Sequence, residues 1–312
     1  LQWHLEEHIT LDAIYHPEDR SENSPVITDH RSSNDWEIGE DIVVRIIKQA
    51  NRQALRALEQ GVNAPRFVLT QVYTEMEMKN LLHDLEADMI SIHFCEKQGH
   101  KTGKSVDVLK NFLDIITKQA KDTASIRGSY NMDMEDMNME ELEEVLVFAK
   151  TQLPAFRVLT VNATPFFASP TNTTTELAET IALANDWLTD FIKRGYSLED
   201  INDQLQFSVA IGTSYFVEIA KLRALRLLWA NVLKAHGASQ LTLPPIEVHF
   251  AESAQTENTY DNMIRGTTQA LSAVIGGANR LTVMPANATK EEPTDFTRRI
   301  ARNVQHLLKL EG

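Results

Sequence analysis

The run Leu205-Gln-Phe-Ser-Val-Ala-Ile211 and the residues after it, Ser214-Tyr-Phe-Val-Glu-Ile-Ala-Lys-Leu-Arg-Ala-Leu-Arg-Leu-Leu-Trp229, decide the fold class. The first run is short and β-prone, so it predicts a strand. A helical spacing follows, in which one apolar stripe is formed by Leu222, Leu225, Trp229, Val232 and Leu233. The two runs together predict a βα unit whose helix extends from Ser214 to Ala235.

The same alternation recurs along most of the chain. Strands are predicted at Phe67–Thr70, Met89–Phe94, Ala124–Ser129, Arg157–Val161, Leu205–Ile211, Ile246–Phe250 and Arg280–Val283. The helices that follow them are predicted at Glu75–Leu85, Ser105–Ala120, Met139–Lys150, Thr175–Lys193, Ser214–Ala235, Asp261–Ile275 and Thr294–Leu308. Consecutive βα units indicate a parallel sheet with right-handed crossovers. No Gly-x-Gly-x-x-Gly opens a helix, so we favour a (β/α)8 TIM-type barrel over an open dinucleotide-binding sheet.

The N-terminal part of the chain is interpreted separately. Residues 1–40 are polar and irregular, and we expect an arm that buries its few apolar residues on another surface. A pre-barrel helix is predicted from Asp41 to Gln60, and the barrel domain is assigned to residues 41–312. Seven βα units are visible, so the eighth strand comes from the N-terminal region, belongs to a longer parent chain that is truncated here, or is missing.

Composition narrows the class of protein. The chain has 312 residues, of which 43% are hydrophobic and 24% charged, as in ordinary globular proteins. A net charge of −14 argues against nucleic acid or an anionic membrane surface as a partner. The single cysteine, Cys95, excludes an internal disulfide and favours a reducing compartment. With no signal pattern and no apolar run of membrane-spanning length, the predicted location is the cytoplasm.

Functional groups of a barrel lie where strands end and βα loops begin. The candidates at this mouth are Gln71, His93, Arg127, Tyr130, Asn162, Thr164, Glu252 and Asn287. Arg127 and Tyr130 could hold an anionic or carbonyl group, and Glu252 could act as a base. The alternative is that all of them satisfy hydrogen bonds at the barrel rim. No histidine pair has metal-ligand spacing, so no metal site is predicted.

Two stretches carry a resemblance to a known family. Phe207-Ser-Val-Ala-Ile-Gly212 with Phe216-Val-Glu-Ile-Ala-Lys-Leu-Arg-Ala-Leu-Arg-Leu-Leu-Trp229 resembles a barrel strand and helix of methylmalonyl-CoA mutases. Tyr260-Asp-Asn-Met-Ile-Arg265 and Pro293-Thr-Asp-Phe-Thr-Arg-Arg-Ile-Ala-Arg-Asn-Val-Gln305 are similar to the same family. The resemblance implies a coenzyme A-threading barrel followed by a cobalamin-binding domain. It also implies conversion between (R)-methylmalonyl-CoA and succinyl-CoA by adenosylcobalamin chemistry.

The chain departs from the catalytic members of that family at three strand ends. Val161-Asn-Ala-Thr-Pro-Phe-Phe-Ala168 replaces a segment that carries a histidine. Phe250-Ala-Glu-Ser-Ala254 and Arg280-Leu-Thr-Val-Met-Pro-Ala286 replace two further family motifs. The Asp-x-His-x-x-Gly loop for cobalamin is absent, and no cobalamin-binding domain is present in this sequence. The pattern resembles the small, non-catalytic subunit of the heterodimeric enzyme.

The resemblance therefore implies a barrel without catalytic residues that stabilises a partner. We expect no cofactor on this chain, with adenosylcobalamin only in the catalytic partner. The partner would be the large catalytic subunit in a heterodimer, or a second copy of this chain. The alternative is an independent barrel enzyme that acts on another acyl-CoA or a small acid.

The last expectation concerns the barrel axis. Phe166 and Phe167 follow the fourth predicted strand, and Phe250 ends a later one. Aromatic rings are bulky, whereas a coenzyme A tunnel needs short wall residues. We therefore expect Phe166, Phe167 and Phe250 to fill the axis, unless these rings face the surrounding helices.

Overall fold

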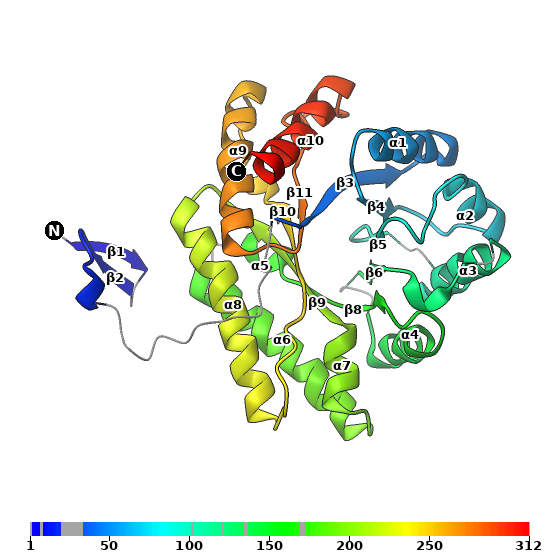
Figure 1. The fold of residues 1–312 in the computed structure, drawn as a ribbon, viewed down its shortest axis with the longest axis horizontal. Coiled ribbons are helices and arrows are strands. Elements are labelled where there is room, and N and C mark those ends of the chain that lie inside the picture. Colours follow the sequence, from blue (N-terminus) through cyan, green and yellow to red (C-terminus); the bar gives the residue numbers. More distant parts are fainter. Residues whose placement is uncertain are drawn as a thin grey trace.

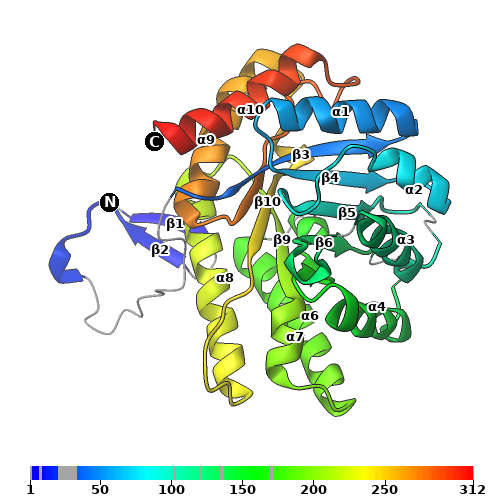
Figure 2. The same ribbon diagram turned by 45° about the vertical axis from the view of Figure 1, so that its right-hand side comes forward.

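A parallel β-sheet that wraps into a barrel, with helices around it, forms the centre of the protein (Figures 1 and 2). The computed structural model describes residues 2–6, 9–19, 34–100, 103–119, 121–133, 137–168 and 172–311. The barrel strands are β3 (Glu37–Val44), β4 (Ala64–Leu69), β5 (Ile92–Glu96), β6 (Gly128–Asn131), β7 (Phe156–Arg157), β8 (Leu159–Asn162), β9 (Leu205–Ile211), β10 (Ile246–Phe250) and β11 (Arg280–Thr282).

The helices follow the strands in alternation and cover the outside of the barrel. They are α1 (Ile47–Glu59), α2 (Glu75–Leu81), α3 (Ser105–Lys118), α4 (Met139–Gln152), α5 (Thr164–Ala168), α6 (Thr173–Lys193), α7 (Leu198–Gln204), α8 (Tyr215–Ala235), α9 (Thr259–Gly276) and α10 (Asp295–Leu310). Short 3-10 helices lie at Pro17–Asp19, Thr123–Ser125 and Glu252–Ala254. The predicted TIM-type barrel is confirmed, while α5 and α7 are helices that the sequence pattern did not reveal.

The strand order closes the sheet around eight positions. In the described residues the order is β7-β6-β5-β4-β3-β11-β10-β9-β8, and every pair is parallel. The two end strands, β7 and β8, are pieces of one chain segment with only Val158 between them. The nine strands therefore occupy eight places, as a (β/α)8 barrel requires.

The eighth strand is β3, so the expected pre-barrel helix from Asp41 to Gln60 is wrong at its start. The chain is extended through Val44, and α1 begins only at Ile47. The run Ile42-Val-Val44 consists of β-branched residues, which favour strands. The first of the three alternatives for the eighth strand, an origin in the N-terminal region, is the observed one.

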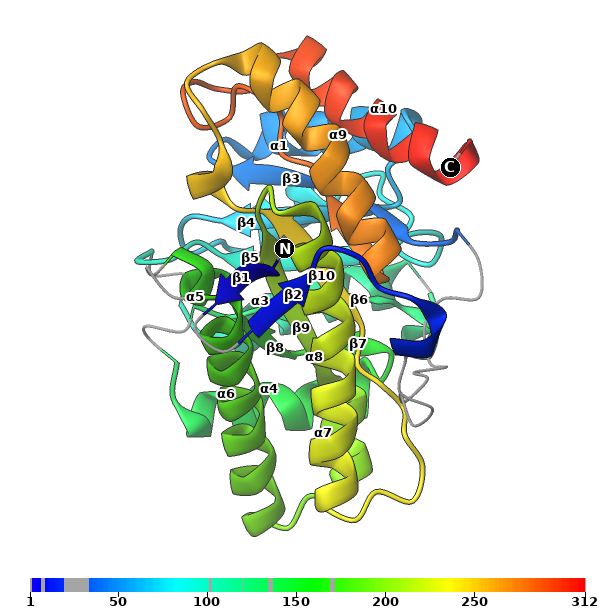
Figure 3. The ribbon, with the colours of Figure 1, turned by 90° about the vertical axis from the view of Figure 1, so that its left-hand side faces the viewer.

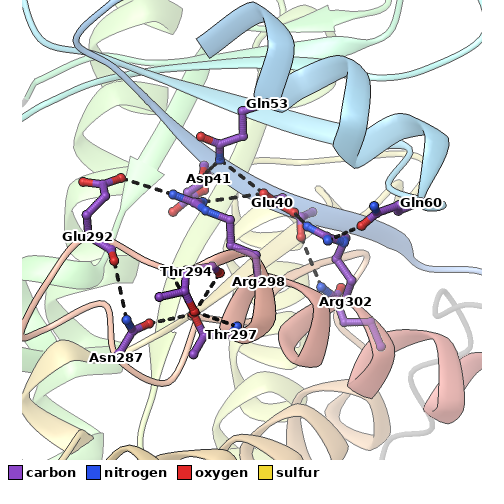
Figure 4. A network of polar contacts seen from close by, with 12 residues as sticks. Glu40, Asp41, Gln53, Gln60, Asn287, Glu292, Thr294, Thr297, Arg298 and Arg302 are labelled. Carbon is purple, nitrogen blue, oxygen red and sulfur yellow. Dashed lines mark hydrogen bonds and ion pairs between the residues drawn. The ribbon is translucent and has the colours of Figure 1, made fainter. Parts of the chain in front are cut away.

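Glu40, on the outward face of β3, joins the first and last parts of the barrel (Figure 4). Its carboxylate lies 2.5 Å from Nη1 of Arg302 and 3.6 Å from Nη1 of Arg298, both on α10. Gln53 of α1 donates its amide N–H to Glu40 Oε1 at 3.2 Å. Because these contacts connect β3 with the helices on either side of it, they fasten α10 to the strand that completes the barrel.

The N-terminal arm contains a β-hairpin of its own. Strands β1 (Gln2–Glu6) and β2 (Ile9–Asp12) pair antiparallel, and the views place them on the side of the barrel that α8 covers (Figures 1 and 3). Trp3, Ile14 and Tyr15 are 61%, 72% and 59% exposed. The arm therefore presents large apolar side chains outward. Within the described residues, no helix is long and apolar enough to cross a membrane.

Candidate functional site

The interior of the barrel carries charged side chains instead of an apolar filling. Successive strand residues point to opposite faces, so the apolar residues of β10, Ile246, Val248 and Phe250, face the helices. Glu247 and His249 between them point to the axis. Seven ionisable residues meet there, and we call them the axial ion cluster: Glu37, Asp41, Arg66, His93, Glu247, His249 and Arg280.

Arg66 of β4 is at the centre of the axial ion cluster. Its guanidinium donates two hydrogen bonds to Asp41 of β3, from Nε at 2.8 Å and from Nη2 at 2.7 Å. Its Nη1 lies 3.9 Å from Oε1 of Glu247 on β10. Two strands, β3 and β11, separate β4 from β10 in the sheet. A contact between them therefore crosses the inside of the barrel.

Glu247 brings further members of the cluster together. It contacts the guanidinium of Arg280 on β11, and its Oε1 lies 3.3 Å from Nε2 of His249. The side chains of Glu247, Arg280 and His249 are 3%, 5% and 10% exposed, whereas that of Asp41 keeps 35%. Burial of a charge without partners is costly, so these groups depend on one another.

His93, on β5, connects the cluster to β6 and to a second residue of β3. Its Nδ1 lies 2.7 Å from the hydroxyl oxygen of Ser129 on β6, and its Nε2 lies 3.5 Å from Oε2 of Glu37 on β3. Burial, together with the positive charge of Arg280, lowers the pKa of His93 to about 3. Burial and the charge of Arg66 lower the pKa of His249 to about 3 as well. Both imidazoles are therefore neutral near pH 7.

The two carboxylates of β3 that belong to the axial ion cluster stay ionised. Burial opposes the charge on Asp41, but the ion pair with Arg66 outweighs it and lowers its pKa to about 2. Burial likewise opposes the charge on Glu37, yet His93, Ser91 and Arg280 lower its pKa to about 2. Burial and the neighbouring charge of Arg66 lower the pKa of Arg280. The cluster thus alternates positive and negative charge across the axis.

Three of the predicted mouth residues, Asn162, Thr164 and Asn287, form local hydrogen bonds at the carboxyl ends of the strands. Asn162 accepts a hydrogen bond from the backbone N–H of Thr164 at 3.1 Å, at the start of α5. Asn287 is buried and accepts a hydrogen bond from the hydroxyl of Thr297 at 2.7 Å, which fixes the loop before α10. Gln71 is exposed after β4. The contacts of Asn162, Thr164 and Asn287 are thus hydrogen bonds within the loops that follow the strands.

The three residues considered for chemistry do not come together. Arg127 precedes β6, because that strand begins at Gly128 and not at Ala124, and so it lies at the opposite end of the barrel. Tyr130 faces the outer helices, fully buried, and donates a hydrogen bond to Glu96 at 2.7 Å. Burial and the charge of Glu96 raise the pKa of Tyr130. Glu252 is exposed in the short helix after β10.

His93 is also displaced from its predicted place, because it lies within the axial ion cluster and not at the mouth. Among the described residues, no group of three or more His, Cys, Asp or Glu side chains is placed to hold a metal ion.

Comparison with known proteins identifies the family to which the chain belongs. The family model described as methylmalonyl-CoA mutase matches residues 66–312. The chain belongs to the methylmalonyl-CoA mutase family. The match begins at Arg66 and includes five of the seven cluster members, while Glu37 and Asp41 precede it.

Among relatives of known name, the methylmalonyl-CoA mutase small subunit of Porphyromonas gingivalis is 30% identical over the whole chain and 54% of its own length. The small subunit of Streptomyces virginiae is 33% identical over 51% of this chain and 26% of its own length. The chain thus spans about half the length of the first of these mutases and less of the second. A dihydropteroate synthase of Thermus thermophilus, 13% identical over 90% of this chain and 96% of its own, matches with a TM-score of 0.47.

The aromatic residues expected to fill the axis of this mutase-family barrel lie elsewhere. Phe250 packs outward, where its ring approaches Gly266 of α9. Phe166 packs against the core outside the strands, and Phe167 lies against Gly212 and the ammonium of Lys221. For Phe250 the expected axial position is wrong, because the ring lies on the same side of β10 as Ile246 and Val248, which pack in the core under the helices.

Sequence reasoning missed six members of the axial ion cluster as site residues: Glu37, Asp41, Arg66, Glu247, His249 and Arg280. A signal was present, because Arg66 and Glu247 are each flanked by apolar residues inside a strand. A charged residue in such a run marks the opposite face of the sheet. Only closure into a barrel turns that face into an enclosed axis.

Proposed function

We propose that this chain is the barrel of a small-subunit-like component of methylmalonyl-CoA mutase, without catalytic activity of its own, that stabilises a catalytic partner. The family reaction interconverts (R)-methylmalonyl-CoA and succinyl-CoA, and adenosylcobalamin would be held by the partner. The observation that carries the proposal is the axial ion cluster, because it occupies the path along which the family threads coenzyme A.

The residues of the axis do not fit an extended acyl-CoA arm. Arg66 and Glu247 come from strands on different sides of the barrel and approach to 3.9 Å. A pantetheine chain on the axis would have to separate them. Breaking a buried ion pair by removing a partner costs about 3–5 kcal/mol, since the remaining charge stays in a medium of low polarity. The arm has no charge to replace the lost contact.

The mouth supports the same proposal. A general acid or base must be within hydrogen-bond reach of the reacting group. Arg127 lies at the other end of the barrel, and the hydroxyl of Tyr130 is engaged with Glu96. The independent-enzyme alternative relied on these two residues and Glu252, so their separate positions support the non-catalytic proposal.

A partner chain is supported by the arm. An isolated two-stranded hairpin is marginally stable in water, and the arm that contains this one exposes Trp3 on the hairpin and Tyr15 after it. Porphyromonas gingivalis has both a small and a large mutase subunit, and its large subunit is 27% identical to this chain over 66% of it. We therefore place the large subunit first among partners and a homodimer second.

Co-expression with a catalytic mutase chain tests the proposal. We expect the two chains to elute together in size-exclusion chromatography, with mutase activity only when the catalytic chain is present. The double variant Trp3→Ser, Tyr15→Ser should weaken the complex, whereas Val147→Ser, also an exposed apolar residue (44%) but on α4, should not. Independent elution of the two chains would contradict the partner role.

Ligand titrations test the absence of a site on this chain. Isothermal titration with succinyl-CoA should give no heat of binding, and adenosylcobalamin should give no saturable spectral change. Binding of succinyl-CoA at tens of micromolar, or a stoichiometric spectral change of adenosylcobalamin, would contradict the proposal and support the independent-enzyme alternative.

A further inference from the structure

Helices α9 and α10 lie side by side on the outside of the barrel and expose their large apolar residues (Figures 1 and 3). Tyr260 and Ile264 of α9 are 74% and 71% exposed. Phe296, Leu307 and Leu310 of α10 are 49%, 55% and 80% exposed. We call these five residues the α9–α10 face. Tyr260 and Ile264 are one turn apart, and on α10 Leu307 lies three turns after Phe296, so each set forms a stripe along its helix.

The residues that the two helices bury are small or polar. They are Asn262, Gly266, Gln269, Ala270, Ser272, Ala273 and Gly276 on α9, and Thr297, Ala301, Arg302 and Gln305 on α10. Half-buried Val274, Val304 and Leu308 add apolar contacts with the core. A helix that only covers its own core turns its largest apolar residues inward. These helices turn them outward, which is typical of a surface that another protein covers.

The charges of α9 and α10 differ in sign from those of the whole chain. The two helices contain five basic residues and two acidic ones, whereas the chain has a net charge of −14. Arg298 and Arg302 contact Glu40, and Lys309 contacts Asp35. The remaining two basic residues of the helices are therefore the ones that a partner could meet.

Three arginines around the α9–α10 face have no acidic partner. Arg265 of α9 donates a hydrogen bond to the carbonyl oxygen of Ala254 at 3.2 Å, and the guanidinium carbon of Arg299 lies 5.7 Å from the centre of the Phe296 ring. Arg223, on the neighbouring α8, donates to a backbone carbonyl oxygen near the end of α9 at 3.2 Å. Among the described residues, no carboxylate forms an ion pair with any of these three guanidinium groups.

The exposed acids of this side do not cancel the arginines. Asp295, at the start of α10, is paired with Arg56 at 2.6 Å. Asp261 on α9 and Glu311 after α10 are exposed. Two carboxylates against three guanidinium groups leave an excess of positive charge around the α9–α10 face.

This excess of positive charge decides between the possible occupants. In a two-fold contact each subunit uses the same patch, so a second copy of this chain would place two arginine-rich rims against each other. A partner whose apolar surface is bordered by aspartate or glutamate would cover the five apolar residues and also pair with the arginines. The charges therefore favour a different chain over a second copy.

We propose that the α9–α10 face is the docking surface for the partner chain, and that the partner meets it with an apolar surface bordered by carboxylates. This inference rests on the partner role proposed above. It adds the position at which the partner binds and the chemistry that it presents there.

The affinity of the purified chain for a catalytic mutase chain tests the apolar part of the surface. Ile264→Gln, Leu307→Gln should raise the Kd at least about tenfold, because two large apolar side chains would no longer be buried. The control Met76→Gln, Val147→Gln changes two apolar residues on α2 and α4 that are 62% and 44% exposed, and it should change the Kd less than about twofold. Glutamine is a good helix former, so both variants should keep the circular dichroism spectrum and urea midpoint of the original chain.

Charge reversal tests the rim. Arg265→Glu, Arg299→Glu should raise the Kd at least about tenfold at low salt, and the Kd should then depend less on ionic strength than it does for the original chain. Lys110→Glu, Lys193→Glu makes the same change in net charge on α3 and α6, at side chains that are 52% and 70% exposed. This control should stay within about threefold of the original Kd.

The results separate the docking surface from the partner role. If the original chain binds the catalytic chain and the α9–α10 variants bind it equally well, the docking surface is wrong and the partner role stands. If the original chain does not bind the catalytic chain, both proposals fail together. A dimer of this chain in analytical ultracentrifugation that Ile264→Gln, Leu307→Gln dissociates would assign the face to a second copy and overturn the proposal.

Discussion

Replacement of Arg66 by methionine tests whether the axial ion cluster holds the barrel together. Methionine has similar length and no charge, so the change removes the guanidinium and leaves Asp41 and Glu247 without their shared partner. Loss of one member of a buried pair costs about 3–5 kcal/mol. Because the Asp41 side chain retains 35% exposure, water can solvate part of the remaining charge, and we expect a loss of about 2–4 kcal/mol.

A matched control is available on the surface. Arg45 pairs with Glu292 at 2.6 Å, close to the Arg66–Asp41 distance of 2.7 Å, but both partners are 63% exposed. Arg45→Met should cost at most about 1 kcal/mol, since exposed ion pairs contribute little. The two variants thus differ in burial and not in the kind of interaction.

Urea unfolding followed by circular dichroism gives the free energies of unfolding. The double variant Arg66→Met, Asp41→Leu should recover part of the loss, because it removes one of the two orphaned charges along with its partner. An Arg66→Met variant that is no less stable than Arg45→Met would refute the role given to the cluster.

Two further outcomes are expected. Burial lowers the pKa of His93 and His249 to about 3. Between about pH 3 and 6.5 these two histidines therefore bind more protons in the unfolded chain than in the folded one. As the pH falls below 6.5, the free energy of unfolding should decrease by up to about 1.4 kcal/mol per pH unit for each histidine. Urea titrations at several pH values measure this slope, and the slope should be smaller in His249→Gln. An unchanged slope in that variant would contradict the assignment of a neutral imidazole to His249. Phe250→Ala should cost about 3–5 kcal/mol, because it empties a space between β10 and α9. It should not create succinyl-CoA binding in calorimetry, whereas a gain of binding would place the ring on the axis after all.

The βα alternation could be read from the sequence because the later strands are apolar runs with clear ends. The predicted Leu205–Ile211 and Ile246–Phe250 coincide with β9 and β10. The sequence reading failed at β3, where Ile42, Ile46 and Ile47 suggest a helical spacing although the chain is extended through Val44. A short apolar run does not distinguish the helical spacing of apolar residues from that of a strand. The pairing of β3 with β4 and β11 makes this segment a strand.

The contents of the axis could not be predicted in the same way. The alternation of side chains along β10 shows that Glu247 and Phe250 point to opposite faces of the sheet. It does not show which of these faces becomes the interior of the barrel. The expectation that the rings fill the axis was based on their bulk and their preference for burial. In a closed barrel both faces are buried, and the helices already supply the apolar partners that rings such as Phe250 require.

Neighbouring residues of β3 fasten the barrel from both sides. Glu40 points outward to Arg302 of α10, and Asp41 points inward to Arg66 of β4. A single strand, the one that completes the sheet, thereby carries one ion pair to the helix layer and one to the axis. A barrel that admits an extended ligand gains from short side chains along its axis. This one places arginines there and ties them to the closing strand, an arrangement that favours a rigid body presented to a partner over a passage for substrate.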